Sequence, residues 1–374
     1  MGNVCLAAVG ICGPIVTLLS SFGTLVGGSI WLSMCLGQKN EKRASQILYN
    51  SFVMLVFLSI CLTLGFIFLK HNLIYWFGGS DALYPYANTY LTIYTLGTFF
   101  ALMSIGLNYF ITGQGYATIA MFSVCIGAIT NIIFDFILIR TLKIGVAGAA
   151  IGTVVAQFLS CMFVLWFLRF KSKIKLKKED LSIDKMKHIV KLGFSPFLII
   201  ASDSVILIVM NMMLQKYGGN MGDVYISAIT VAQRYFLLIT GPLLGISSGT
   251  QPIFAYHFGS RNLKKIKEAF KIVISFAFLF CLIMFIVSMC YSNVFVAMFT
   301  QDITTMPIAQ RAIKIFCLGI LMMSIQYVLV DGITGLSNVK LSLFLSLNRK
   351  LMYLCCTCLL PAFLGVSIFS MHNQ

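Results

Sequence analysis

Long apolar stretches follow one another along this chain and are separated by short polar segments. Each stretch is about 20 residues or longer, which is the length that an α-helix needs to cross ~30 Å of hydrocarbon. The stretches are too long and too uniformly apolar to be strands of a membrane barrel. The pattern predicts about ten membrane-spanning helices: Leu6–Leu36, Ile47–Leu69, Tyr90–Ile111, Tyr116–Ile139, Val146–Leu168, Leu192–Leu214, Ile226–Phe254, Phe270–Met289, Ile313–Ile333 and Leu343–Ile368.

The composition agrees with this pattern. Of the 374 residues, 59% are hydrophobic and 10% are charged, and the mean hydropathy is +0.94. A soluble domain carries about a quarter charged residues, so the composition excludes a soluble protein and indicates one embedded in lipid. The twelve cysteines are scattered through the apolar stretches and are interpreted as core residues. No cofactor and no resident metal are expected.

Basic residues are distributed unevenly among the loops. The loops after the first, third, fifth, seventh and ninth predicted spans, with their flanks, hold 18 of the 27 Lys and Arg, and the opposite loops hold six. Because basic residues mark the cytoplasmic side, the loops at Lys39, Lys178 and Lys265 are predicted to be cytoplasmic and both chain ends to face outward. The net charge of +16 therefore indicates membrane topology rather than nucleic-acid binding.

Two segments of the chain carry nearly the same phrase, "CLGQKNEKRA" and "HFGSRNLKKI". When the chain is aligned with itself at an offset of 222 residues, Gly37 matches Gly259 and Asn40 matches Asn262. The same offset aligns "ITGQG" with "ITGLS". One ungapped offset over about 90 residues indicates two related halves. Six spans separate each matched pair, so the halves have the same orientation. This is a parallel repeat about the membrane normal, which is typical of alternating-access transporters.

The repeat also predicts how the chain is organised. Residues 1–170 are expected to form an N-terminal bundle, residues 171–191 a solvated basic cytoplasmic linker, and residues 192–374 a C-terminal bundle. Gly23-x-x-x-Gly27 and Gly245-x-x-x-Gly249 place small residues on one helix face, where a second helix can approach closely. The fold class is therefore an all-α integral membrane protein.

Five segments together resemble the multidrug and toxin extrusion (MATE) transporters, especially bacterial ones. They are "GGSIWLSMCLGQKNEKRASQIL", "ITGQGYATIAMFSVCIGAITNIIFDFILI", "GVAGAAIGTVVAQ", "LQKYGG" and "GTQPIFAYHFGSRN". The resemblance covers nearly the whole chain and rests on the ordered set rather than on one segment. It implies two six-helix bundles related by a pseudo-two-fold axis in a bacterial cell membrane. It also implies export of drugs or other organic, often cationic, molecules in exchange for inward sodium ions or protons.

The chain departs from the family pattern at both ends. Its ten predicted spans resemble the family's second to eleventh helices, so the first and last helices are expected to be absent. The first helix carries an acidic residue of the cation site in many members. An inactive truncated fragment is therefore one alternative to a working exporter.

Three acidic residues lie within the predicted spans: Asp135, Asp203 and Asp331. A carboxylate in the middle of a span costs roughly 2.5–3.5 kcal/mol on insertion scales, so each is a candidate functional residue. Hydrogen bonding between helices and an interfacial position are the structural alternatives. Asp331 is placed near the end of its span, at an interfacial position, and ranks below the other two.

Asp135 is the strongest candidate for a coupling site. Asn131 precedes it by four residues, so both lie on one face of the same helix, and the next span offers Thr153. A carboxylate, an amide oxygen and a hydroxyl suit sodium, whereas the carboxylate alone suffices for a proton. The resemblance also implies this role, because some MATE proteins hold a cation with Asp, Asn and Thr at the matching places. Sodium and proton coupling both remain open.

Other polar residues within the spans are candidates for a substrate cavity, although a position in the lipid-facing core is favoured for any single Gln or Asn. They are Asp203, Asn211, Gln157, Arg234, Gln251, Gln326 and Asp331. The expected partners are small organic, often cationic, substrates and membrane lipid. Nucleic acid is excluded, and the chain is expected to act as a monomer.

Two further functions are alternatives to export. A flippase for lipid-linked sugars of the same wider superfamily would line its cavity with several cations, but only Arg234, Arg349 and Lys350 qualify here. An intramembrane enzyme would need a metal or nucleophile constellation, and the four histidines are isolated from one another. The sequence therefore favours the exporter, with no catalytic residue.

Overall fold

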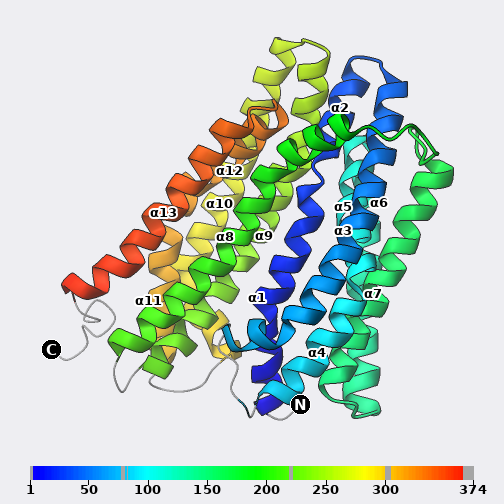
Figure 1. The fold of residues 1–374 in the computed structure, drawn as a ribbon. Coiled ribbons are helices and arrows are strands. Elements are labelled where there is room, and N and C mark those ends of the chain that lie inside the picture. Colours follow the sequence, from blue (N-terminus) through cyan, green and yellow to red (C-terminus); the bar gives the residue numbers. More distant parts are fainter. Residues whose placement is uncertain (1–2, 77–80, 82, 219–221, 300–304, 365–374) are drawn as a thin grey trace. The chain divides into compact units, whose positions relative to one another are not determined.

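The computed structural model describes residues 3–76, 81, 83–218, 222–299 and 305–364, and this part of the chain forms helices joined by short connections (Figure 1). In chain order these are α1 (Asn3–Leu25), α2 (Gly28–Gly37), α3 (Glu41–Trp76), α4 (Tyr84–Leu96), α5 (Thr98–Gly113), α6 (Ala117–Asp135), η1 (Phe136–Thr141), α7 (Val146–Trp166), η2 (Phe167–Lys171), α8 (Ile183–Gly218), α9 (Gly222–Gly259), α10 (Leu263–Phe299), α11 (Thr305–Leu318), α12 (Ile320–Gly335) and α13 (Val339–Leu364). The predicted all-α membrane fold is confirmed.

Every predicted span coincides with a helix or with a pair of helices. Within the described ranges, six helices are long and apolar enough to cross a membrane. Two pairs add to them if each pair is one bent span: α4 with α5, bent by 55°, and α11 with α12, bent by 49°. α8 and α13, which coincide with two further predicted spans, fall outside this set. The end of the last predicted span, beyond Leu364, lies outside the described residues.

The chain divides into two compact units. The first unit contains residues 1–204 and 255–261, and the second contains residues 205–254 and 262–374. In the first unit α5 packs against α1, α3, α6 and α7, around buried side chains such as Leu107 and Phe110. In the second unit α10 packs against α11 and α12. The bundle boundaries and the parallel relation inferred from the repeat remain predictions.

Residues that are 222 positions apart in the repeat also share the same local backbone geometry. Lys39 and Arg261 occupy the same place in the repeat, and both have positive φ, 58° and 56°. The side chain of the following asparagine then caps a helix start in each case: Asn40 Oδ1 accepts from the backbone N–H of Arg43 at 3.0 Å, and Asn262 Oδ1 from that of Lys265 at 3.1 Å. The predicted turn is therefore the same structure built twice.

Glycines of the repeated phrase allow close backbone packing inside the first unit. A Cβ added to Gly37 would lie 2.1 Å from the Tyr256 carbonyl oxygen, and one added to Gly259 would lie 2.2 Å from that of Met34. The predicted close approach also holds for Gly27, where an added Cβ would lie 2.3 Å from the backbone nitrogen of Gly193. By contrast, Gly245 and Gly249 have no described neighbour within 4 Å of an added Cβ.

Candidate functional site

Three helices of the first unit bring polar side chains together around a cavity of about 440 Å³. The polar residues follow helical spacing, three or four residues apart on α5 and α7 and eight apart on α6, so each helix presents one polar stripe. The stripes are Ser104, Asn108 and Thr112 on α5; Ser123 and Asn131 on α6; and Thr153, Gln157 and Ser160 on α7. The volume lies within the range of small-molecule sites, about 300–1,000 Å³.

Hydrogen bonds across helices hold this polar lining. Ser123 Oγ donates to Asn108 Oδ1 at 3.0 Å, which joins α6 to α5. Ser160 Oγ donates to the Ser123 carbonyl oxygen at 2.9 Å, which joins α7 to α6. A buried polar group without a partner is costly, so these bonds make a polar cavity compatible with a membrane bundle.

Two of the predicted coupling residues are in direct contact. Asn131 Nδ2 donates to Thr153 Oγ1 at 3.3 Å, and that hydroxyl donates to the Ala149 carbonyl oxygen at 2.9 Å. Both residues also line the cavity.

Asp135 lies one helical turn beyond Asn131, where α6 passes into the π-helical segment η1. Its Oδ1 packs on the backbone of Gly152 in α7, where an added Cβ would lie 2.6 Å from that oxygen. Oδ1 is buried and has no hydrogen-bond partner among the described residues. The carboxylate therefore reaches α7 one residue before Thr153. An orphaned acceptor of this kind fits a bound proton or a small cation.

Gln157 completes the polar side of the cavity. Its Nε2 donates to the Tyr94 hydroxyl at 3.0 Å, while its Oε1 is buried without a partner in the described part of the chain. Gln157 was a predicted cavity residue, and it does line the cavity.

Asp331 lies in the second unit and bridges two helices. Its carboxylate accepts hydrogen bonds from Ser247 Oγ and from Gln251 Nε2, the latter at 2.8 Å, and both donors are on α9. This is the structural alternative considered for an acidic residue within a span, and it also accounts for Gln251. The position is a helix–helix contact in the second unit.

The other predicted cavity residues do not gather around this cavity. Gln326 Nε2 donates to the Leu345 carbonyl oxygen at 3.1 Å, and Asp203 and Arg234 are exposed on α8 and α9. The side chain of Asn211 lies outside the described residues. Their role in substrate binding therefore remains a prediction.

The basic residues that a flippase would need have separate surroundings in the second unit. The Arg349 guanidinium lies 4.7 Å from the ring centroid of Tyr327, and Lys350 is 6% exposed. Arg234 is exposed. These positions describe packed or surface side chains rather than a shared cationic pocket.

Sequence reasoning missed the stripe on α5 and the serines at 123 and 160. A signal was present, since Ser104, Asn108 and Thr112 recur every fourth residue within an apolar stretch. A single Ser, Thr or Asn in such a stretch is a weak signal because it can bond its own helix, as Ser104, Thr112 and Ser123 do. Only their shared face distinguishes them.

A family model described as MatE matches residues 1–137 and 200–353 of the chain. Two curated relatives carry the name "Multidrug export protein MepA". The protein from Staphylococcus haemolyticus is 28% identical over 332 residues, and that from Staphylococcus saprophyticus is 24% identical over 327 residues. Each alignment covers 86% of this chain and 71% of the relative.

Solved structures share the fold at lower identity. The crystal structure of a MATE point mutant superposes with a TM-score of 0.88 at 23% identity, covering 100% of this chain and 82% of that one. A MOP superfamily transporter from Pyrococcus furiosus gives a TM-score of 0.91 at 22% identity, covering 98% and 83%.

Proposed function

The chain belongs to the MatE family, whose model matches most of its length, and from this premise we propose that it exports drugs and other small organic molecules. It is a multi-pass membrane transporter and not an enzyme. Relatives named as multidrug export proteins align with 86% of the chain and support the proposal. The chain spans 71% of the length of those relatives.

The observation that carries the proposal is the cavity between α5, α6 and α7. Its lining combines hydroxyl and amide groups with apolar side chains such as Ile105 and Val124, and the described lining residues include no charged side chain. Tyr109 adds an aromatic ring to the lining, which suits a cationic ligand through cation–π attraction. Such a surface accepts organic molecules of varied shape because few contacts are charge-specific.

Transport is coupled, in this proposal, to sodium or protons at Asp135, with Asn131 and Thr153 as the further oxygen ligands. An ionised carboxylate inside a bundle needs a compensating charge. The nearest basic residue along the helix is Arg140, whose guanidinium lies 5.7 Å from the ring centroid of Phe136. The buried, unpartnered Oδ1 of Asp135 supports a role in holding a proton or a cation.

Coupling would follow from differential affinity. Ion occupancy at Asp135 shifts the balance between outward-facing and inward-facing states only if the two states bind the ion unequally. One charge moving through the whole membrane potential supplies ~2.3 kcal/mol per 100 mV. Exchange of one ion for one neutral substrate would then sustain about a fifty-fold concentration ratio.

The purified chain in proteoliposomes tests this function. Ethidium serves as the probe, and its movement is followed by fluorescence under an imposed sodium gradient, an imposed pH gradient, or neither. The proposal expects one ion gradient to drive ethidium against its concentration and the other to have little effect. Ethidium movement that is the same with and without both gradients would contradict coupling, and no movement under any condition would contradict export by this chain.

A further inference from the structure

The segment between η2 and α8, residues 172–182, carries an alternating pattern that transport does not explain. We call it the strap. Lys173, Lys175 and Lys177 are exposed, and so is Lys171 just before the strap, whereas Ser172 and Ile174 are buried and Leu176 is half-buried. In an extended segment alternate side chains point to opposite sides. The lysines therefore form one outward edge, and Ser172, Ile174 and Leu176 face the first unit.

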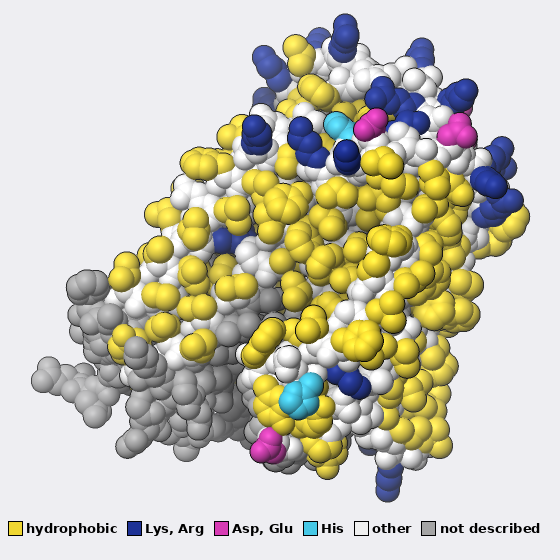
Figure 2. Space-filling view, viewed as in Figure 1, with side chains coloured by type: hydrophobic (Ala, Val, Ile, Leu, Met, Phe, Trp, Pro, Cys, Tyr) yellow, Lys and Arg dark blue, Asp and Glu magenta, His cyan; other side chains and the backbone are white. Residues whose placement is uncertain are grey.

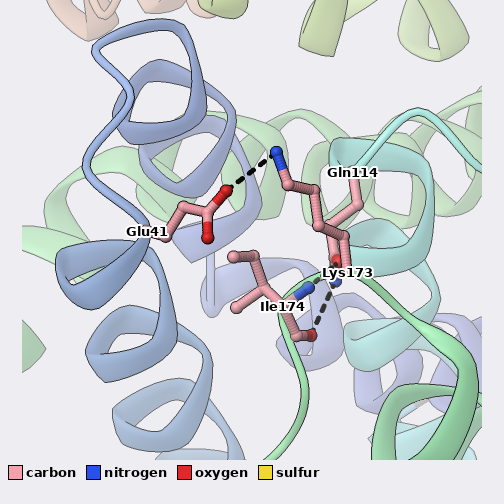
Figure 3. Close-up of polar contacts among 4 residues, drawn as sticks. All are labelled: Glu41, Gln114, Lys173 and Ile174. Atoms are coloured by element: carbon pink, nitrogen blue, oxygen red, sulfur yellow. Dashed lines mark hydrogen bonds and ion pairs between the residues drawn. The ribbon is translucent and has the colours of Figure 1, made fainter.

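The strap is fixed at its first turn by a side-chain amide. Gln114, just after α5, donates from Nε2 to the Ile174 carbonyl oxygen at 3.3 Å and accepts from the Ile174 backbone N–H at 2.7 Å (Figure 3). Beside it Lys173 Nζ lies 2.8 Å from Glu41 Oε1 (Figure 3). The Glu41 contact raises the pKa of Lys173, so that ammonium stays charged. The two hydrogen bonds of the Gln114 side chain resemble those of a neighbouring strand. They fix the orientation of the strap backbone and therefore the side to which each strap side chain points.

A second amide fixes the far end of the strap. Asn50 on α3 is fully buried; its Nδ2 donates to the Asp180 carbonyl oxygen at 3.0 Å, and its Oδ1 accepts from the Ser182 N–H at 2.9 Å. Ser45 Oγ also donates to Glu179 Oε1 at 2.8 Å. The strap is therefore anchored to the first unit at both ends and is not a freely solvated linker.

The outward edge is strongly positive. Residues 169–191 contain nine Lys and Arg but three Asp and Glu, a net charge of +6. Two of the nearby carboxylates already have partners: Glu179 accepts from Ser45, and Glu41 pairs with Lys173. Figure 2 shows Lys and Arg side chains around the place where Figure 1 draws the connection from η2 to α8, next to a broad area of hydrophobic side chains.

Exposed apolar residues flank these lysines. Phe170 precedes the strap and is 60% exposed, Leu181 near its end is 57% exposed, and Ile183 at the start of α8 is 71% exposed. Water disfavours such side chains, whereas the region where lipid headgroups meet acyl chains accepts apolar groups beside basic ones. A nucleic acid or an acidic protein would use the charge but would leave these three residues unexplained.

We propose that the strap is a docking surface for anionic phospholipid headgroups of the cytoplasmic leaflet. The lysines along its outer edge face the headgroup phosphates, and Phe170, Leu181 and Ile183 enter the interface on either side. Because Gln114 and Asn50 already hold the backbone, lipid binding does not have to order it. Anionic lipid would in turn hold the strap on α3 and α5 and stabilise the first unit.

Lipid selectivity of the purified chain tests the proposal. Phosphatidylglycerol and phosphatidylcholine are titrated separately, and bound lipids are counted by native mass spectrometry. The strap variant replaces Lys171, Lys173, Lys175 and Lys177 with Gln; the matched control replaces Lys264, Lys265, Lys267 and Lys271, which are exposed on α10. Both lose four charges on the predicted cytoplasmic side. The proposal expects the strap variant to bind phosphatidylglycerol at least about tenfold more weakly and the control to stay within about twofold.

Further results of these titrations, and of one more variant, would contradict the proposal. Equal loss in both variants, or equal binding of the two lipids by the unmodified chain, would overturn the proposal. Tighter binding of an acidic oligonucleotide than of phosphatidylglycerol would overturn the assignment to lipid, as would full competition by soluble glycerol phosphate. The Gln114→Met variant keeps every lysine but loses both Ile174 bonds; it should bind phosphatidylglycerol more weakly and show faster amide exchange in the strap. Unchanged binding would overturn the role of the anchors.

Discussion

Gly37 and Gly259 occupy equivalent positions in the repeat, and both lie against a backbone carbonyl oxygen. Each lies so close to a carbonyl oxygen of the facing segment, from Tyr256 or Met34, that a methyl group would fall within 2.2 Å of it. A backbone oxygen cannot move aside as a flexible side chain can. Glycine therefore stands at both positions of the repeated phrase because two backbone segments of the first unit are in contact there.

Substituting Gly37 with alanine should destabilise the protein by about 1–3 kcal/mol, as overpacking does. Thermal unfolding of the purified variant in detergent measures this. Gly65→Ala is the matched control, since Gly65 also lies within a helix, α3, and an added Cβ meets nothing described within 4 Å. It should be neutral or more stable by up to about 1 kcal/mol, because alanine favours the helix. Equal melting temperatures for the two variants would show that the close approach is absent.

Residues of the candidate site were predictable to different degrees. A carboxylate in an apolar span is conspicuous in sequence, so Asp135 stood out together with Asn131 at four-residue spacing. Asp331 was also visible as a carboxylate in a span, yet its donors Ser247 and Gln251 are 84 and 80 residues away in the chain. Pairing between distant helices is set by packing, which a single sequence does not encode locally. The roles of all these residues remain predictions.

At the scale of helices, the two bent pairs break at equivalent places. Gly97 separates α4 from α5 and Gly319 separates α11 from α12, again 222 residues apart. Their surroundings differ: a Cβ on Gly97 would lie 2.5 Å from Val154 Cγ2, whereas one on Gly319 meets nothing described within 4 Å. The bend is therefore shared by both halves, and the tight packing belongs to the first.

This difference predicts unequal tolerance of alanine. Gly97→Ala should lower stability by about 1–3 kcal/mol through overpacking, and Gly319→Ala should change it by no more than about 0.5 kcal/mol. Adding Val154→Ala to Gly97→Ala should recover part of the loss, because it removes the methyl groups that the new Cβ would meet. Thermal unfolding of these three variants and of Val154→Ala alone measures this coupling. No recovery in the double variant would mean that Gly97 is needed for its backbone alone.

A second element-scale feature lies where α8 begins against α2. The Trp31 ring has the Arg43 guanidinium 5.0 Å from its centroid and the His188 ring at 4.4 Å. Burial, then the positive charges of Lys191 and Arg43, lower the pKa of His188 from its usual 6.5. The folded state therefore favours neutral His188. Its contribution to stability is fully present above pH 6.5 and is lost as the pH falls through the lowered value.

Trp31 fluorescence should report this titration, since a protonated histidine quenches a neighbouring indole. The midpoint that depends on His188 should fall below 6.5, and Lys191→Gln should move it upward by removing a nearby positive charge. Lys178→Gln removes one positive charge from the strap instead and should leave the His188 midpoint nearly unchanged. His188→Asn identifies the component that belongs to this residue. A midpoint at or above 6.5 in the unmodified chain would contradict the described contacts.

For the whole molecule, the apolar stretches were enough to predict the membrane class and the helices, and the phrases matched 222 residues apart predicted the repeat. Lipid forces backbone polar groups to bond within helices, so long apolar stretches leave little choice of structure. The strap was harder to predict. A lysine-rich segment reads as a solvated linker, and its anchors Asn50 and Gln114 lie 130 and 60 residues away in sequence. Alternation of lysines with Ile174 and Leu176 was the signal that could have identified it.

The central claim for the whole molecule is that export is coupled through Asp135. Asp135→Asn removes the negative charge at nearly constant shape, so a site that needs a proton or a cation loses it. Asp331→Asn makes the same chemical change at a residue that joins α9 to α12, and it should keep ion dependence even if stability falls.

The decisive measurement is ethidium transport in proteoliposomes under the driving ion gradient, with equal amounts of reconstituted protein. We expect Asp135→Asn to lose gradient-driven transport, down to about a tenth of the unmodified rate or less, and Asp331→Asn to retain it. Gradient-driven transport by Asp135→Asn at the unmodified rate would contradict coupling through this carboxylate and would make Asp135 a structural residue.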